Sequence, residues 1–527
     1  MKLFLKKFEW WLSLFLLVFG LAIPFLIFLN RVFIPDVSAD SLNYHLYLGF
    51  KGINWENNKY EFFPTGIHNF SPILDMVGFG FNALLGYRLG TFFSVLAIYL
   101  GILAIYKIYK LLNHKGKILG DLGSTFLLVS SFLSFELFLG VGSYYVDGLV
   151  AMAGLWVVYW LIKGNLFLAG FLLSVLVAGK QTNLYLVPAF GMVVLYQWFK
   201  KKIATKKALL VLGVVMLLPL WWYGKNWLVT GSPIFPFYNA VFKSKYFAPV
   251  SFHEPQFGGE NLWQRLGWGY YSALKPARLG QVHDLFNDYK INIYFVMAIL
   301  ALFLARSWLV SFYVVAFLGW GLSFGYLRYG LILEYLGGLI ILLIYSKFQN
   351  KSWRYFLFLP LFLVLLVQNK RVVNLSLAYD IGFRPGYFYN RESYPKEFKN
   401  ILASKIKADK SLVYKPDIYL NCEVGGMTYY VLSPFTNLPV LNIGQNAYSQ
   451  MTNNSNYKEE SKLRLEKHLR AKDRVKFVTI AARSGMNTEY ESCLKNITIR
   501  GFMVESEEET SFLGYERQKL VIITGHL

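Results

Sequence analysis

Apolar runs separated by short polar segments fill the chain as far as about Val367. Each run is close to the roughly 20 residues that a helix needs to cross a bilayer, and Trp, Tyr and Phe gather at the run ends as they do at membrane interfaces. The pattern predicts a polytopic α-helical membrane protein with about eleven spans. The predicted spans are residues 10–29, 89–111, 119–139, 144–162, 165–179, 182–199, 208–223, 291–305, 308–326, 330–346 and 354–369.

Composition supports this pattern and excludes soluble domains for most of the chain. Of the 527 residues, 55% are hydrophobic, 18% are aromatic and only 16% are charged. The first apolar run, residues 10–29, is too long for the core of a signal peptide and lacks a small-residue cleavage site. We therefore predict that it is retained as the first span.

The net charge of +22 would fit a nucleic-acid-binding protein, but its distribution indicates a membrane orientation signal. With the N-terminus inside, the inner ends of the predicted spans carry 17 basic residues against two acidic ones, Glu9 and Asp121. The basic residues are Lys2, Lys6, Lys7, Lys107, Lys110, Lys115, Lys117, Lys163, Lys200, Lys201, Lys202, Lys206, Lys207, Arg306, Lys347, Lys351 and Arg354. The positive-inside rule therefore predicts a multi-pass protein of the cytoplasmic (inner or plasma) membrane whose C-terminal residues lie outside. Its basic residues are expected to contact membrane lipids and not nucleic acid.

The segment Pro72–Gly86 is apolar, but its 15 residues are few for a span and include Asp75. If it crossed the membrane, every later loop would change sides and the lysine-rich loops would face outward. We therefore predict that it lies in or against the outer interface, within a long first outer loop of residues 30–88.

The unusual polar residues fall on the outer side of this topology. They are Asp36, Asp40, His45, Glu61 and His68 in the first outer loop, Glu136 and Asp147 at outer span ends, Lys180 in a break between two short runs, Lys225 and Asn226 at the start of a long loop, and Arg328 with Tyr329 late in the bundle. Ionisable groups at membrane depth cost roughly 2.5–3.5 kcal/mol each, so they usually face a cavity with a function. We predict one cavity that opens outward.

Each of these residues also has a structural interpretation. Asp36 would serve as an interface anchor or helix cap, Glu136 would pair with a neighbouring helix, and His45 and His68 would make structural hydrogen bonds. The long basic side chains would extend their charged ends to the interface. The chain has neither H-x-x-x-H nor C-x-x-C spacing, so the sequence predicts no metal site and no cofactor, without excluding a divalent metal.

Several motifs occur together on this one side. They are D-x-x-x-Y at Asp40 and Tyr44, an acidic residue at Asp147, G-K-x-T around Lys180, N-W-x-x-T-G-x-P-x-x-P over residues 226–236, and the pair Arg328–Tyr329. In this order, over roughly residues 1–370, they resemble the GT-C superfamily of polyprenyl-phosphate-sugar glycosyltransferases. The branch they resemble holds the protein O-mannosyltransferases and the lipid A aminoarabinose transferases. Two positions depart from the usual pattern, since Ser41 follows Asp40 in place of Glu, and Ser71 precedes Pro72 in place of Pro.

The resemblance implies a GT-C-like catalytic domain that moves a sugar from a polyprenyl-phosphate donor to a hydroxyl of a glycan, lipid or protein acceptor. Asp40 fits the general base, and Asp147 would bind the acceptor or orient Asp40. Lys180, Lys225 and Arg328 would stabilise the lipid phosphate as it leaves. The remaining candidates are Asp36 beside Asp40, with Tyr44, His45, His68 and Tyr329 as supporting groups. Such a displacement predicts inversion at the anomeric carbon, and the chain has no Gly-rich nucleotide loop.

From about Arg371 the composition becomes that of a soluble domain, and residues 371–527 are predicted to form a small extracytoplasmic α/β domain. Residues 410–416, 475–481 and 519–525 resemble strands, and residues 456–473 resemble a charged helix. Cys422 and Cys493 both fall here and form either a disulfide or two buried thiols. Acceptor binding or covering of the cavity is the expected role.

Two other functions remain open on the sequence. A transporter would place ionisable groups near the bilayer midplane in repeated halves, but the chain shows no repeat and its charges lie at one face. A polymerase or ligase for lipid-linked polysaccharides would use a large late outer loop. The loop from Lys225 to Lys290, with Arg265, Lys275 and Arg278, keeps that alternative open.

Overall fold

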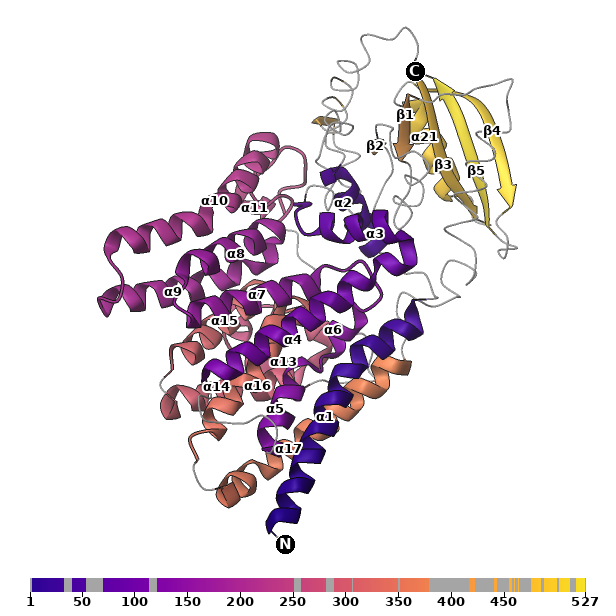
Figure 1. The fold of residues 1–527 in the computed structure, drawn as a ribbon. Coiled ribbons are helices and arrows are strands. Elements are labelled where there is room, and N and C mark those ends of the chain that lie inside the picture. Colours follow the sequence, from indigo (N-terminus) through magenta and orange to yellow (C-terminus); the bar gives the residue numbers. More distant parts are fainter. Residues whose placement is uncertain are drawn as a thin grey trace.

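The computed structural model of the chain has a helical part and a C-terminal part (Figure 1). In the helical part it describes residues 2–32, 40–53, 70–112, 121–250, 257–280, 289–305, 307–348 and 351–378. In the C-terminal part it describes residues 417–421, 440–442, 455, 456, 459, 463, 475–484, 488–499, 502–511 and 518–526.

Each predicted apolar run falls on a helix of the described helical part. These helices are α1 (Lys2–Arg31), α4 (Phe92–Leu112), α5 (Leu122–Phe132), α7 (Asp147–Ile162), α8 (Leu166–Gly179), α9 (Leu186–Phe199), α10 (Thr205–Thr230), α14 (Lys290–Leu304), α15 (Trp308–Ser323), α16 (Leu331–Tyr345) and α17 (Lys351–Ala378). Within the described residues, five helices are long and apolar enough to cross a membrane by length and composition, and five apolar helices are shorter. The chain is therefore a multi-pass membrane protein, while the count of eleven spans stays a prediction.

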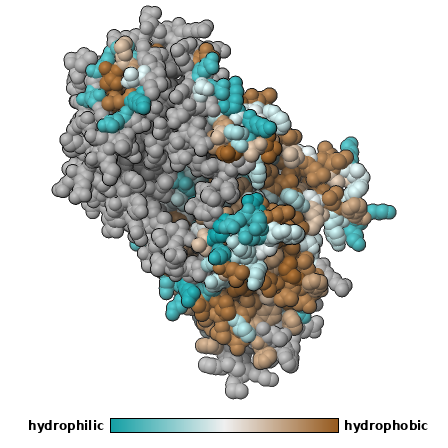
Figure 2. All heavy atoms as spheres, turned by 180° about the vertical axis from the view of Figure 1, so that it is seen from behind, coloured by the Kyte–Doolittle hydropathy of each residue, from teal (hydrophilic) through white to brown (hydrophobic). Residues whose placement is uncertain are grey.

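Many exposed side chains of the helical part are hydrophobic, as expected for helices in contact with lipid. Figure 2 shows hydrophobic side chains over much of the helical part. On α10, Leu209, Leu217 and Leu220 are each more than half exposed. A helix that is apolar all round and only partly covered by protein is expected to meet lipid.

Helix α16 lies at the centre of the bundle, packed against α4, α5, α7, α14 and α15. Of its candidate span, 83% is buried, against 28% for α10. Two adjacent glycines permit this packing, because a Cβ at Gly337 would lie 2.1 Å from the ring of Tyr294 and one at Gly338 would lie 2.0 Å from Ser131 Oγ. Small residues let membrane helices approach closely. The central helix directly follows the turn that carries Arg328.

The predicted span 119–139 is broken. Helix α5 ends at Phe132, Leu133 is extended, and α6 (Phe135–Leu139) begins after Ser134, whose side chain accepts a hydrogen bond from the Leu137 N–H. The Leu133 carbonyl freed by the break accepts a hydrogen bond from Lys290 Nζ. Lys290 also pairs with Glu334 at 2.8 Å, and both side chains are almost fully buried. The break was not predicted, because both halves are apolar and carry no Pro or Gly at the break.

The first and last helices of the bundle lie side by side along one flank (Figure 1). Arg31 at the end of α1 is buried, and its Nη1 donates to the carbonyls of Phe138 (2.6 Å) and Val141 (3.0 Å). Its Nη2 donates to the carbonyl of Ser376 in α17 at 3.3 Å. One guanidinium therefore joins α1, the end of α6 with the segment that follows it, and the end of α17.

The segment predicted to lie at the outer interface forms helix α3 (Asp75–Gly90), which bends at Gly86, where φ is 79°. Helix α2 (Leu46–Ile53) packs against it. The two short helices lie at the end of the bundle nearer the C-terminal part (Figure 1). Whether α3 enters the interface stays a prediction.

The C-terminal part contains a five-stranded sheet in the order β2-β1-β3-β5-β4. Its strands are β1 (Ile418–Asn421), β2 (Val440–Asn442), β3 (Lys476–Ser484), β4 (Met503–Ser511) and β5 (Gln518–His526), with α21 (Thr488–Ile499) packed on β3. Strand β1 is parallel to β2 and β3, whereas β5 pairs antiparallel with β3 and β4.

The predicted strands 475–481 and 519–525 match β3 and β5. The predicted strand 410–416 lies outside the described residues, and so does most of the predicted helix 456–473. Cys493 is disulfide-bonded, and the other cysteine of the chain, Cys422, lies outside them too.

Candidate active site

Four separate stretches bring charged side chains together at one end of the bundle. They supply Asp40 before a π-helical turn (Ser41–His45), Asp147 at the start of α7, Lys180 after α8, and Arg328 in the 3₁₀ turn Leu327–Gly330. We refer to Asp40, Asp147, Lys180 and Arg328 as the charged cluster. Asp40 and Arg328 are 288 positions apart in the sequence.

Arg328 is the centre of the charged cluster. Its Nη1 donates to Asp40 Oδ2 at 2.7 Å, and its Nη2 donates to the hydroxyl of Tyr44 at 3.4 Å. Its Nε lies 3.2 Å from Asp147 Oδ2 in an ion pair without hydrogen-bond geometry. Three aromatic rings surround the guanidinium carbon at 4.9, 5.6 and 5.7 Å, namely those of Tyr145, Tyr326 and Tyr329. The rings favour the cation and exclude water from its faces.

Lys180 occupies the predicted break between α8 and the 3₁₀ turn Gln181–Tyr185, where its backbone is extended. Its Nζ donates to Asp147 Oδ1 and lies 4.8 Å from the centre of the Tyr329 ring. Tyr185 donates from its hydroxyl to the backbone carbonyl of Tyr329 at 3.0 Å, which fixes the backbone that carries this ring. Burial lowers the pKa of Lys180, and Asp147 opposes this effect. Asp147 therefore favours the charged form of Lys180 in this position.

Asp40 is the most exposed member of the charged cluster. Its side chain is 33% exposed, against 7% for Asp147, 11% for Arg328 and 15% for Lys180. Burial acts to raise the pKa of Asp40, but the charges of Arg328 and His45 outweigh it and hold the pKa below its usual value. The carboxylate is therefore ionised at neutral pH and has a face that a substrate can reach.

A buried pair fastens the first outer loop beside the charged cluster. His45 Nδ1 lies 2.6 Å from Asp75 Oδ1, and both side chains are almost fully buried. Burial raises the pKa of Asp75, and His45 opposes this effect. The His45 ring lies 4.2 Å from that of Tyr44, and Ser41 Oγ accepts a hydrogen bond from the Tyr144 N–H at 3.2 Å. Asp40 and Tyr44 are thereby attached to α3 and to the segment before α7.

The role of Asp75 was not predicted, although a signal was present. A carboxylate within an apolar segment needs a partner, and the nearest histidines in the sequence are His45 and His68. His45 therefore has the structural hydrogen bond that was expected as its alternative, and it also lies against the charged cluster.

The structure places the remaining candidates as follows. The ring of Tyr329 lies beside Lys180 and Arg328 of the charged cluster. Lys225 lies on α10 with its Nζ 4.6 Å from the ring of Trp222. Asp36 and His68 lie outside the described residues. Glu136 is buried in α6. Among the residues that the structure describes, no group of three or more His, Cys, Asp or Glu side chains is arranged to hold a metal ion.

No family model and no curated protein sequence matches the chain. Its structure is similar to the crystal structure of ArnT from Cupriavidus metallidurans bound to undecaprenyl phosphate, with a TM-score of 0.50 and 12% sequence identity. The similarity covers 96% of this chain and 97% of that one. The chain has the fold of ArnT. The apo structure of the same ArnT is similar over the same shares of both chains, with a TM-score of 0.49 and 13% identity.

The similarity to ArnT agrees with the fold that the sequence resemblance implies. Because the similarity to ArnT extends past α17, it includes the C-terminal part as well as the bundle.

Proposed function

We propose that this protein is a membrane glycosyltransferase that moves a sugar from a polyprenyl-phosphate donor to an acceptor hydroxyl. The observation that carries the proposal is the charged cluster, which combines two carboxylates with two cations at one end of a bundle with the fold of ArnT. Undecaprenyl phosphate is bound in the ArnT crystal structure. A lipid phosphate and a reacting hydroxyl need this combination of cations and a base.

In the proposed reaction, Asp40 takes the proton of the acceptor hydroxyl while the acceptor oxygen forms a bond to the anomeric carbon. The bond from that carbon to the phosphate oxygen breaks, and the lipid phosphate leaves with the electron pair. Lys180 and Arg328 stabilise the negative charge of the leaving phosphate, and Asp147 keeps both cations in position. A single displacement of this kind inverts the configuration of the anomeric carbon.

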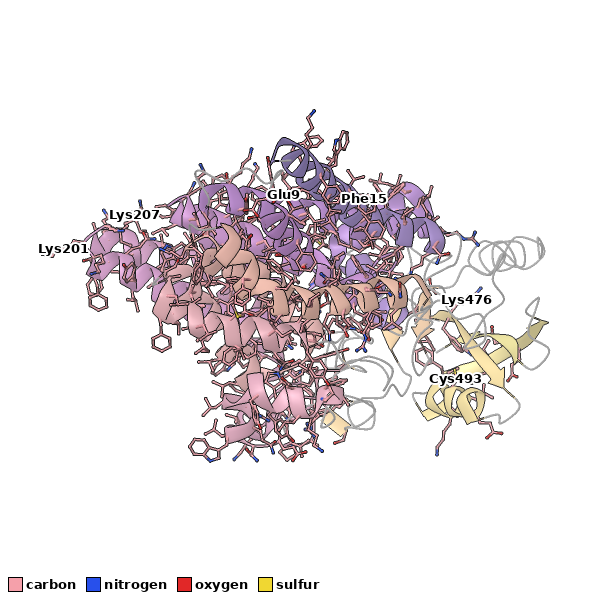
Figure 3. All side chains as sticks on the ribbon, turned by 90° about the horizontal axis from the view of Figure 1, so that it is seen from below. Glu9, Phe15, Lys201, Lys207, Lys476 and Cys493 are labelled. Carbon is pink, nitrogen blue, oxygen red and sulfur yellow. The ribbon has the colours of Figure 1, made fainter. Side chains whose placement is uncertain are left out.

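Lys180 precedes the start of α9 and the basic connection to α10 follows its end, so the site lies at the opposite end of this helix from the connection. Figure 3 places Lys201 and Lys207 of that connection at one end of the molecule and Lys476 and Cys493 at the other. With the basic end in the cytoplasm, the reaction takes place on the outer face of the cytoplasmic membrane. The C-terminal part, on the same side as the site, is suited to bind the acceptor or to cover the cavity.

Replacement of the base tests the proposal. Asp40→Asn keeps the shape of the side chain but cannot take a proton, so transfer from polyprenyl-phosphate sugars should fall by about 10²–10⁴-fold. Asp36→Asn, four positions earlier, serves as the matched control and should cost less, because a neighbouring group orients the base without accepting the proton. Near-normal transfer by a folded Asp40→Asn protein would exclude Asp40 as the base and make Asp147 the next candidate.

A further inference from the structure

Lys180 and Arg328, the cations assigned to the donor phosphate, are already paired with carboxylates. Arg328 holds Asp40 and lies in an ion pair with Asp147, and Lys180 donates to Asp147. Within the charged cluster, two positive charges therefore face two negative charges. An arriving phosphate would meet a neutral site, although an anion site is expected to carry excess positive charge.

Each nitrogen of Arg328 also has a neighbour, and Nη1 and Nη2 donate hydrogen bonds. Nη1 faces Asp40, Nη2 faces Tyr44 and Nε faces Asp147. A guanidinium binds phosphate through N–H groups on two neighbouring nitrogens, and each such pair in Arg328 includes a nitrogen that faces a carboxylate, either Nη1 beside Asp40 or Nε beside Asp147. Because a carboxylate repels the phosphate, the phosphate binds best when one of these carboxylates moves away. Asp147 is nearly buried and is held by Lys180 as well, whereas a third of the Asp40 side chain is exposed. Asp40 is therefore the partner that a ligand arriving from the open side reaches first.

We propose that the donor phosphate displaces Asp40 from Arg328, so that Asp40 is released as a base only when the donor is bound. This inference rests on the proposed function. While Arg328 holds Asp40, the carboxylate is a weak proton acceptor, because its positive partner stabilises the ionised form. Once the phosphate takes the guanidinium, that stabilisation is lost and the proton affinity of Asp40 rises. The donor therefore binds before the acceptor hydroxyl is activated.

The exchange predicts that removing the base improves donor binding. In Asp40→Asn the competing negative charge is gone, while the amide oxygen still accepts a hydrogen bond. Because charge-assisted hydrogen bonds are about twice as strong as neutral ones, undecaprenyl phosphate should bind roughly tenfold more tightly to this variant than to the original chain. Transfer by the same variant should fall by about 10²–10⁴-fold, so binding and turnover change in opposite directions.

The experiment measures the dissociation constant of undecaprenyl phosphate for the full chain in lipid nanodiscs, with undecaprenol as the ligand that lacks the phosphate. The matched control is Glu260→Gln, which removes a carboxylate from an ion pair with Arg278 (2.6 Å) outside the charged cluster. This control should leave the dissociation constant unchanged.

Each outcome decides between the two proposals. Equal or weaker binding by a folded Asp40→Asn protein overturns the exchange and leaves the proposed function standing. Failure of the original chain and of the variant to bind undecaprenyl phosphate better than undecaprenol overturns both. If Asp40→Asn does not fold, Asp40→Ser replaces it, since it also removes the carboxylate that Arg328 holds and leaves Asp147 in place. Tighter binding then supports the exchange, and unchanged or weaker binding overturns it.

Discussion

Lys180 and Lys225 have the same side chain and were both assigned to the donor phosphate on sequence, but their surroundings differ. Lys180 is held by Asp147 and by the ring of Tyr329, within the charged cluster. Lys225 lies against the ring of Trp222 on its own helix. The carboxylate and the aromatic ring hold the ammonium of Lys180 in one position, where it can also donate a hydrogen bond to a phosphate oxygen.

We expect the two lysines to differ in their effect on donor use. Lys180→Ala should raise the KM for the polyprenyl-phosphate sugar by about tenfold or more, because a charge-assisted hydrogen bond to the phosphate is lost. Lys225→Ala is the matched variant and should change the KM by less than about threefold. The measurement is the initial rate against donor concentration. A larger effect of Lys225→Ala would place the phosphate near α10 instead.

The members of the charged cluster were predictable because charged residues at the ends of apolar runs stand out in the sequence. Their pairing was not predictable. Nothing in the spacing of Asp40 and Arg328 indicates that they touch across 288 positions, and both residues were assigned separate roles. The His45–Asp75 pair was missed too, although a carboxylate within an apolar segment indicates that a partner is needed.

At the scale of elements, the broken helix α5–α6 depends on a buried ion pair. Lys290 at the start of α14 donates to the Leu133 carbonyl and pairs with Glu334 in α16, while Ser134 donates to Glu334 Oε2 at 2.6 Å. The ion pair therefore supplies a hydrogen-bond donor to the Leu133 carbonyl at the break and fixes the first turn of α16. Because Arg328 lies in the turn just before α16, the ion pair also supports the position of the charged cluster.

Removing one partner of this ion pair should be costly. Lys290→Met leaves Glu334 buried without its cation and should destabilise the folded protein by about 3–5 kcal/mol. The double variant Lys290→Met/Glu334→Leu replaces the pair with apolar side chains and should recover most of the loss. Chemical unfolding in detergent provides the measurement. A double variant as unstable as the single one would show that the bonds to Leu133 and Ser134 matter more than the buried charge.

Helix positions were predictable from the apolar runs because membrane helices need a continuous stretch of such residues. The break at Lys180 was visible as a charge between two short runs. The true length of α10 was not, because its last turns include Lys225 and Asn226, which resemble a loop. The side chain of Asn226 donates to the Pro233 carbonyl, so the polar residue is satisfied by the turn that follows the helix.

At the scale of the whole molecule, the basic connection and the sheet lie at opposite ends (Figure 3). The charge pattern predicts that a membrane separates them. A single cysteine at Thr205 and one at Glu507, both exposed positions, should label from opposite sides with a membrane-impermeant maleimide. Cys493 is disulfide-bonded and has no thiol to react with the maleimide. Permeabilised membranes are the control. Labelling of both positions from the same side would contradict the predicted topology.

Arg31 has a consequence for how the protein is made. The first helix emerges from the ribosome with a guanidinium whose final partners include a carbonyl 345 positions later in the chain. Until α17 has been synthesised and inserted, that charge lacks part of its final set of acceptors and must rely on water or lipid head groups. The N-terminal helices therefore cannot reach their final packing until the C-terminal helix of the bundle is present. The hydrogen bond from Arg31 of α1 to Ser376 forms only after α17 has been inserted.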